Sequence, residues 1–194
     1  MAMANMMMAV LIAGAGAVAT PSPSMTLPLK PADIAVEYHG SSADLTQQVR
    51  SAADERFADY AGALKARDYQ RAYAMLRLSY QAANPRIEWE MKLRARDGLW
   101  ADGNIRILRL SWHMDPADQP LGRYAVYDFR GDRPDGGMDC GYVVLHQPAE
   151  NADFSVVRTD ASYVPSSLMA GDFPQVEVLR QLPCFLGKGM VSAL

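Results

Sequence analysis

The chain is poor in the residues that build metal and redox centres. Its 194 residues include two cysteines and three histidines, and no CxxC or HExxH motif occurs. Two cysteines cannot supply the four ligands of a structural zinc site, and no histidine has a second ligand at metal-binding spacing. The sequence therefore predicts no bound metal ion.

Nucleotide-binding and serine-hydrolase motifs are also absent. The chain has no GxSxG, no P-loop and no GxGxxG, so nothing favours a serine hydrolase or a nucleotide cofactor. Its 19 basic and 22 acidic residues give a net charge of −3, without a basic cluster. Such a balance provides no electrostatic case for nucleic acid. We predict neither a cofactor nor a nucleic-acid partner.

The N-terminal segment lacks charge, and Lys30 is its first charged residue. Met6–Ala19 is an apolar run that is too short to span a membrane, and it ends in the small-x-small pattern Ala17-Val18-Ala19. This layout predicts a signal peptide at residues 1–19, cleaved near Ala19, and a periplasmic or secreted protein. Because no basic residue precedes the run, a buried or frayed apolar N-terminus is the alternative.

What is present indicates one globular domain. Apolar residues make up 49% of the chain and charged residues 21%, which is ordinary for a folded body. The Pro- and Ser-containing residues 20–41 are assigned to a linker, residues 42–164 to an α+β domain, and residues 165–194 to a C-terminal tail packed on that domain. Helical periodicity runs from Ser42 to Leu64, and further helices are predicted from Asp68 and from Asn84-Pro85.

The second half of the domain has the two-residue period of strands. Four strands are predicted, at Asn104–Met114, Gly122–Arg130, Met138–Gln147 and Phe154–Tyr163. The Gly-, Pro- and Asp-rich Gly131–Gly137 predicts a hairpin turn between the second and third. Helices followed by consecutive strands indicate an α+β fold, with N-terminal helices packed on a curved antiparallel sheet of about four strands.

Three features between Phe57 and Tyr163 resemble a known bacterial family. They are Ala66-Arg67-Asp68-Tyr69 with Tyr73, the strand Tyr124–Phe129, and Cys140-Gly141-Tyr142 followed by Phe154–Asp160. Together they resemble the domain of unknown function 4019, a family without an established activity.

The resemblance mainly implies a fold. Members of that family are similar to the cone-shaped nuclear transport factor 2, whose fold ketosteroid isomerase and scytalone dehydratase share. In that fold, helices pack across a strongly bent antiparallel sheet and leave a cavity. The resemblance does not cover the tail from Pro165. A homodimer formed through the exposed sheet face follows by fold analogy alone.

The two cysteines, Cys140 and Cys184, are isolated in the sequence. In an oxidising compartment, such a pair most simply forms one disulfide, which would join the tail to the sheet. The alternative is two buried thiols that behave as small apolar side chains.

Acid–base candidates lie on the central strands. Alternation places His146 and Tyr142 on one face, and Asp128 is on the neighbouring strand. Burial can bring the pKa of such groups toward neutrality, which suits proton transfer next to a carbonyl or a dehydration. We therefore name these three residues as candidate catalytic residues.

Ligand-binding candidates are Trp112, as core or cavity wall, and Arg158 with Asp160, which share a face of the last strand. The structural alternative is an Asp128–Arg158 ion pair that closes a sheet edge, with His146 hydrogen-bonded or exposed. A one-residue change of register would scatter the whole set.

Three functions remain open from the sequence. The first is an exported, non-enzymatic domain that binds a small apolar ligand or an envelope protein. The second is a metal-independent acid–base isomerase or dehydratase that uses His146 and Asp128. The third is a structural envelope protein. The enzyme hypothesis requires that His146 and an aspartate open onto one enclosed cavity.

Overall fold

A computed structural model describes residues 35–40, 45–95, 100, 104–149, 152–169, 182 and 184. The predicted signal peptide and most of the predicted tail lie outside these residues. None of the described helices is long and apolar enough to cross a membrane.

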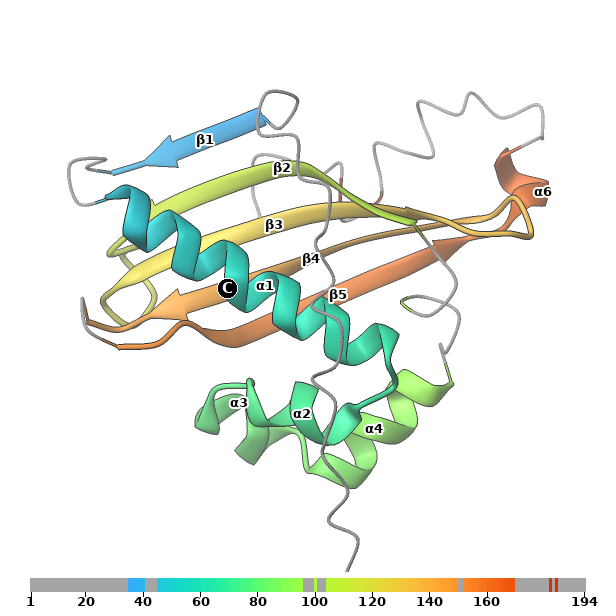
Figure 1. Ribbon diagram of the computed structural model, residues 1–194, viewed down its shortest axis with the longest axis horizontal. Coiled ribbons are helices and arrows are strands. Elements are labelled where there is room, and N and C mark those ends of the chain that lie inside the picture. Colours follow the sequence, from blue (N-terminus) through green and yellow to red (C-terminus); the bar gives the residue numbers. More distant parts are fainter. Residues whose placement is uncertain are drawn as a thin grey trace, which may run out of the picture.

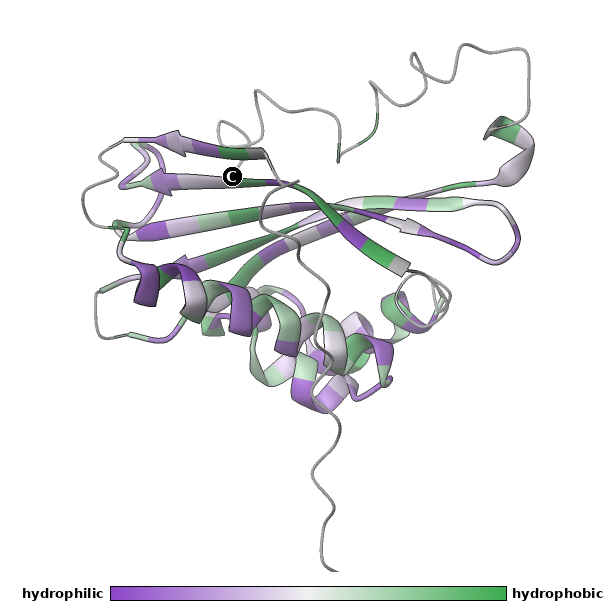
Figure 2. Cartoon of the chain, turned by 45° about the horizontal axis from the view of Figure 1, so that its top comes forward, coloured by the Kyte–Doolittle hydropathy of each residue, from purple (hydrophilic) through white to green (hydrophobic). Residues whose placement is uncertain are grey.

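The order of the elements confirms the predicted α+β class. The elements are β1 Ala35–His39, α1 Gln47–Lys65, α2 Tyr69–Ala74, α3 Leu78–Ala83, α4 Arg86–Arg94, β2 Asn104–Met114, β3 Arg123–Asp132, β4 Met138–Gln147, β5 Ser155–Val164 and α6 Ser166–Met169. Figure 1 shows α1 lying across one face of the sheet, with α2, α3 and α4 gathered beyond its β5 side. In Figure 2, hydrophilic and hydrophobic bands alternate along α1, as expected for a helix with one buried face.

The sheet has five strands in the order β1-β2-β3-β4-β5. β1 pairs in parallel with β2, and every other pair is antiparallel. The predicted number of about four strands is wrong, because β1 lies within the segment assigned to a linker. Five residues give too short an alternation to identify a strand, and its pairing with β2 is a long-range contact. The sheet is open, and the cone expected from the resemblance is not confirmed.

Helix α1 begins later than its periodicity suggests. Thr46 is its N-cap, and its side-chain oxygen accepts a hydrogen bond from the Val49 amide at 3.3 Å. The buried residues of α1 are Val49, Ala53, Phe57, Tyr60, Ala61, Ala63 and Leu64. The rings of Phe57 and Tyr127 stack with their centroids 4.5 Å apart.

Aromatic side chains fill the space between α1 and the sheet. Trp100 packs on Phe129 with ring centroids 4.8 Å apart, and Trp112 meets the edge of Phe154 at 6.2 Å. All four side chains are buried. Among the described residues, this face is therefore a packed core.

The predicted second helix is divided into α2 and α3 by contact with the sheet. Between them, the Arg77 amide donates to the Val156 carbonyl at 2.8 Å, and the Val156 amide donates to the Met75 carbonyl at 2.9 Å. This short pairing covers the start of β5, whose edge would otherwise be open there. It also carries the Arg77 side chain around that edge.

The strands contain two kinds of local feature, a close approach at a glycine and register shifts that change which side chains share a face. Gly141 marks a close approach of β4 and β5, because a Cβ there would collide with the Asp160 carbonyl. The register shifts lie elsewhere, between Ile107 and Arg109 and between Val144 and Leu145.

A disulfide joins Cys140 to Cys184, with the two Cα atoms 5.3 Å apart, and confirms the predicted bond. Cys184 is buried in a small apolar cluster with Met138, Val164 and Leu182. The bond therefore attaches this part of the chain to the face of β4 that carries Cys140.

Candidate ligand site on the sheet face opposite α1

The face of the sheet that points away from α1 carries most of the chemistry-bearing side chains. One row runs in register across four strands, from Arg109 of β2 through Asp128 and Tyr142 to Asp160 of β5. Arg158 lies on the same face in the next row, opposite Val144. The structure thus brings together four of the residues named from the sequence, Asp128, Tyr142, Arg158 and Asp160.

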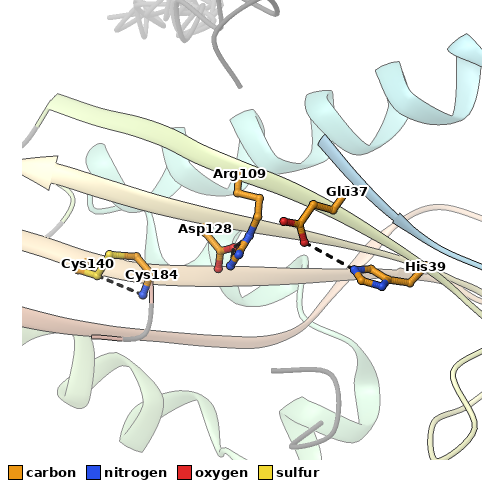
Figure 3. A network of polar contacts seen from close by, with 6 residues as sticks. All are labelled: Glu37, His39, Arg109, Asp128, Cys140 and Cys184. Atoms are coloured by element: carbon orange, nitrogen blue, oxygen red, sulfur yellow. Dashed lines mark hydrogen bonds and ion pairs between the residues drawn. A yellow bond between two sulfur atoms is a disulfide. The ribbon is translucent and has the colours of Figure 1, made fainter. Parts of the chain in front are cut away.

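Asp128 is the most unusual residue of this row. It is 0% exposed, and its Oδ2 accepts hydrogen bonds from Nε and Nη2 of Arg109, at 2.7 and 2.5 Å. Among the residues that the structure describes, its Oδ1 has no hydrogen-bond partner. Figure 3 shows Arg109 and Asp128 pointing toward each other, with Glu37 on the neighbouring strand. The expected ion pair with Arg158 is therefore wrong, since the partner of Asp128 is Arg109.

Burial dominates the electrostatics of Asp128. Loss of water raises the pKa of its carboxyl to about 6, the Arg109 guanidinium opposes the shift, and Glu37 adds to it. The group therefore changes charge close to neutral pH. A buried acceptor without a donor is costly, by about 1–3 kcal/mol.

Tyr142 lies beside Asp128 and is also buried. Burial raises the pKa of its hydroxyl, and Arg158 opposes this shift. The Arg158 guanidinium lies over the Tyr142 ring, 5.7 Å from its centroid. Asp160 is exposed at the end of the row. The row therefore passes from a buried carboxylate to an exposed one.

Apolar side chains border the row on this face. Val126 and Val144 pack with Tyr124 and Tyr142 in one buried cluster. An acceptor next to an apolar surface is the usual composition of a small-molecule site.

His146 is on the same face but takes no part in the row. It pairs with Tyr124, whereas Asp128 pairs with Tyr142, four residues along β4. Four residues of strand span about 13 Å. This separation keeps the two candidate acid–base groups apart.

Both ring nitrogens of His146 are engaged. Nδ1 lies 3.1 Å from Nη1 of Arg77, and Nε2 lies 3.0 Å from the Leu121 carbonyl oxygen. A guanidinium only donates and a carbonyl only accepts, so Nδ1 carries the lone pair and Nε2 the proton. Burial, with the positive charge of Arg77, lowers the pKa of His146. The ring is held neutral.

Trp112 lies on the other face. It is 1% exposed and belongs to the core beneath α1. Its register partner is Ala125, which is on the core face of β3. Asp128 is on the opposite face, so Trp112 cannot line a site with it. Its role is packing, which the sequence offered as one of two readings.

All three histidines share one cross-strand row. His39 pairs with His113, His113 with Tyr124, and Tyr124 with His146. The rings of His39 and His113 stack with centroids 4.3 Å apart. His39 is in β1, and His113 is buried, with its pKa lowered to about 4 mainly by burial.

Sequence reasoning missed Arg109 and Asp139. Leu108 is the extra residue at a register shift, which reverses the alternation that would place Arg109 with Ile107 on the core side. Asp139 is 1% exposed, and no described residue donates a hydrogen bond to either of its oxygens. It forms an ion pair with Arg133 at 3.5 Å. Burial raises the pKa of Asp139 to about 6.

Within the described residues, no three His, Cys, Asp or Glu side chains are arranged to hold a metal ion. No protein-family model, curated protein or solved structure matches the chain. The resemblance to the domain of unknown function 4019 family therefore stays a prediction.

Proposed function

We propose that this protein is an exported, non-enzymatic binding domain whose small-molecule site is the sheet face around Asp128. One observation carries the proposal: no described residue donates a hydrogen bond to the buried Oδ1 of Asp128. Buried polar atoms without partners are rare in folded proteins and often belong to functional sites. A ligand that donates a hydrogen bond to this oxygen would remove the cost.

The surroundings favour a ligand with an apolar body. Val126, Val144 and the Tyr142 ring belong to one buried apolar cluster on the same sheet face as Asp128. Because Asp128 is screened from water, ligand binding requires displacement of the side chains that now exclude solvent. We therefore expect slow association.

The acid–base enzyme hypothesis has less support. A general acid or base needs an ionisable group with a free position within hydrogen-bond reach of the substrate. Both nitrogens of His146 are already engaged, by Arg77 and Leu121, and the ring is several residues from Asp128. Export is supported by the Cys140–Cys184 disulfide, since such bonds persist in oxidising compartments.

A screen for ligand-induced thermal stabilisation of the disulfide-bonded protein tests the proposal. A ligand at a hundred times its dissociation constant adds about 2.7 kcal/mol to the free energy of unfolding. We expect hits among apolar compounds with a hydrogen-bond donor. Asp128→Asn should weaken them, and Asp139→Asn, which changes a comparable buried carboxyl away from the site, should not. A folded protein with no hits, or hits indifferent to Asp128→Asn, contradicts the proposal.

A second candidate is binding of a protein partner on the outer helices. Leu78 of α3 and Ile87 and Met91 of α4 are 79%, 70% and 58% exposed. Residues of α2, α3 and α4 line an open hollow of about 480 Å³. They are Gln70, Tyr73, Ala74, Gln81 and Arg86. Large exposed apolar side chains are typical of interaction surfaces. Loss of a captured envelope partner on Ile87→Ser with Met91→Ser would support this surface.

A further inference from the structure

We infer that the outer helices, α2, α3 and α4, dock this protein on the surface of a bilayer that contains anionic phospholipid. The inference goes beyond the proposed function and does not depend on Asp128. It follows from apolar side chains that these helices leave exposed and from the positive charge around them. A protein partner on the same helices is the alternative occupant, and binding to lipid vesicles separates the two.

Helix α4 is apolar on two opposite sides. Trp89 is buried, with its ring centroid 5.4 Å from that of Tyr73, and Leu93 packs on the core. Residues two positions apart are about 200° apart around a helix, so Ile87 and Met91 lie on the side opposite Trp89. Both are more than half exposed. One apolar stripe of α4 therefore attaches the helix to the protein, and the other faces outward.

Exposed apolar side chains are concentrated on the outer helices. Four large apolar side chains of the described residues are more than half exposed, and three of them are Leu78, Ile87 and Met91. The fourth, Leu121, lies between β2 and β3. Leu78 begins α3, none of whose six residues is buried, and α3 and α4 border the same open hollow. Such a concentration is typical of an interaction surface.

The outer helices also differ from the rest of the chain in charge. Residues 65–95 contain seven basic and three acidic residues, a net charge of +4, whereas the whole chain carries −3, so the remaining residues carry −7. The basic residues do not form one run in the sequence, and the fold brings the helices that carry them together beyond β5 (Figure 1). Six of the seven are exposed: Lys65, Arg67, Arg71, Arg86, Lys92 and Arg94.

Carboxylates from neighbouring elements reduce this charge without cancelling it. Asp59 of α1 pairs with Arg71 at 3.1 Å, and counting it lowers the net charge of +4 to +3. Asp160 and Arg158 of β5 both act on Tyr80 of α3, and together they add no net charge. A surface that stays positive attracts anionic head groups, and the attraction weakens as salt is added.

A bilayer satisfies both properties of this surface. Anionic head groups receive the guanidinium and ammonium groups, and the apolar region beneath them receives the exposed apolar side chains. Nucleic acid would match the charge but offers no apolar phase to Ile87 and Met91. Since no described helix is long and apolar enough to cross a membrane, the outer helices would lie on the bilayer surface.

Co-sedimentation with lipid vesicles tests the inference. The disulfide-bonded protein is mixed with vesicles of phosphatidylcholine, with and without phosphatidylglycerol, at low and at high salt. At low salt, we expect binding to the anionic vesicles to be tighter than binding to the neutral ones by at least about tenfold. Added salt should remove most of this difference.

Two pairs of substitutions assign the binding to the outer helices. Arg86→Gln with Lys92→Gln should weaken binding to anionic vesicles by about fivefold for each charge removed. Ile87→Ser with Met91→Ser should weaken it by at least about tenfold. A retained Met6–Ala19 run would bind lipid equally in every variant, so the differences between variants report on the helices.

Matched controls change the same kinds of residue elsewhere. Arg106→Gln removes an exposed positive charge from β2, and Leu121→Ser removes an exposed apolar side chain from the loop before β3. Neither should alter vesicle binding. All of these positions are exposed, so we expect each variant to keep the thermal unfolding of the wild-type protein.

The opposite results overturn the inference. Equal binding to neutral and anionic vesicles does so, as does binding that both pairs of substitutions leave unchanged. Absence of vesicle binding overturns it as well. If an envelope protein is then captured and Ile87→Ser with Met91→Ser abolishes the capture, the surface belongs to a protein partner. Ligand hits that depend on Asp128 without vesicle binding contradict this inference alone, and vesicle binding with a flat ligand screen contradicts the proposed function alone.

Discussion

Individual buried ionisable residues change the free energy of unfolding of this protein in opposite directions as the pH changes. Asp128 and Asp139 have pKa values raised to about 6, and His113 has one lowered to about 4. Burial is the first cause in each case, because it disfavours whichever form is charged. Carboxyl and imidazole groups therefore respond with opposite sign.

Asp128 should stabilise the fold in acid. Its folded pKa is above the unfolded value of 3.8, so its contribution is fully present below about pH 4 and is lost as pH rises through about 6. The free energy of unfolding relative to Asp128→Asn should therefore fall by about 2–3 kcal/mol between pH 4 and pH 7. Urea denaturation at both values measures this. A constant difference between the two proteins would show that Asp128 is not buried as described.

His113 should act in the opposite direction. Its folded pKa is below the ordinary 6.5, so its contribution is present above pH 6.5 and is lost as pH falls through about 4. Compared with His113→Gln, the wild-type protein should lose about 2–3 kcal/mol between pH 7 and pH 4. The same denaturation series tests it. Equal acid sensitivity of the two proteins would contradict the assignment.

At the scale of elements, local patterns predicted the sheet better than the helices. The bounds of β2 and β4 match the predicted strands to the residue, because ten or more alternating residues give a strong signal. The division into α2 and α3 depends on pairing with Val156, and a contact so distant in sequence leaves no local pattern.

The alternation of side chains along each strand and the order of the strands predict part of the site. Asp128, Tyr142 and Asp160 share a row because they lie on adjacent antiparallel strands. Arg109 could not be foreseen, since the register shift at Leu108 reverses its face. The sequence left Trp112 open as core or cavity wall, because only the actual pairing tells which side of β2 meets α1.

Two glycines in different elements should respond oppositely to alanine. In β4, a Cβ on Gly141 would collide with the Asp160 carbonyl and the Phe129 ring, so Gly141→Ala should destabilise the protein by about 1–3 kcal/mol. In α1, a Cβ on Gly62 meets nothing within 4 Å. Gly62→Ala should stabilise by about 0.5–1 kcal/mol. Thermal unfolding of both variants is the measurement, and destabilisation by Gly62→Ala would contradict the packing described for α1.

At the scale of the whole molecule, the disulfide closes a loop between residues 44 positions apart. Such a loop restricts the unfolded chain and is expected to contribute about 4 kcal/mol. Cys140→Ser with Cys184→Ser should lower the free energy of unfolding by that order in chemical denaturation. Adding a reductant should affect the wild-type protein and leave the double variant unchanged. Equal stability of the two proteins would show that the bond constrains little.

The pairing of Met75 and Arg77 with Val156 makes the helical layer and the sheet one cooperative unit. The outermost antiparallel strand, β5, gains a backbone partner from a segment that lies between β1 and β2 in the chain, and Arg77 then contacts His146 on the far side of the sheet. The helices beyond β5 cannot open without exposing that strand. In native-state hydrogen exchange, the amides of Arg77 and Val156 should therefore exchange with the same opening free energy.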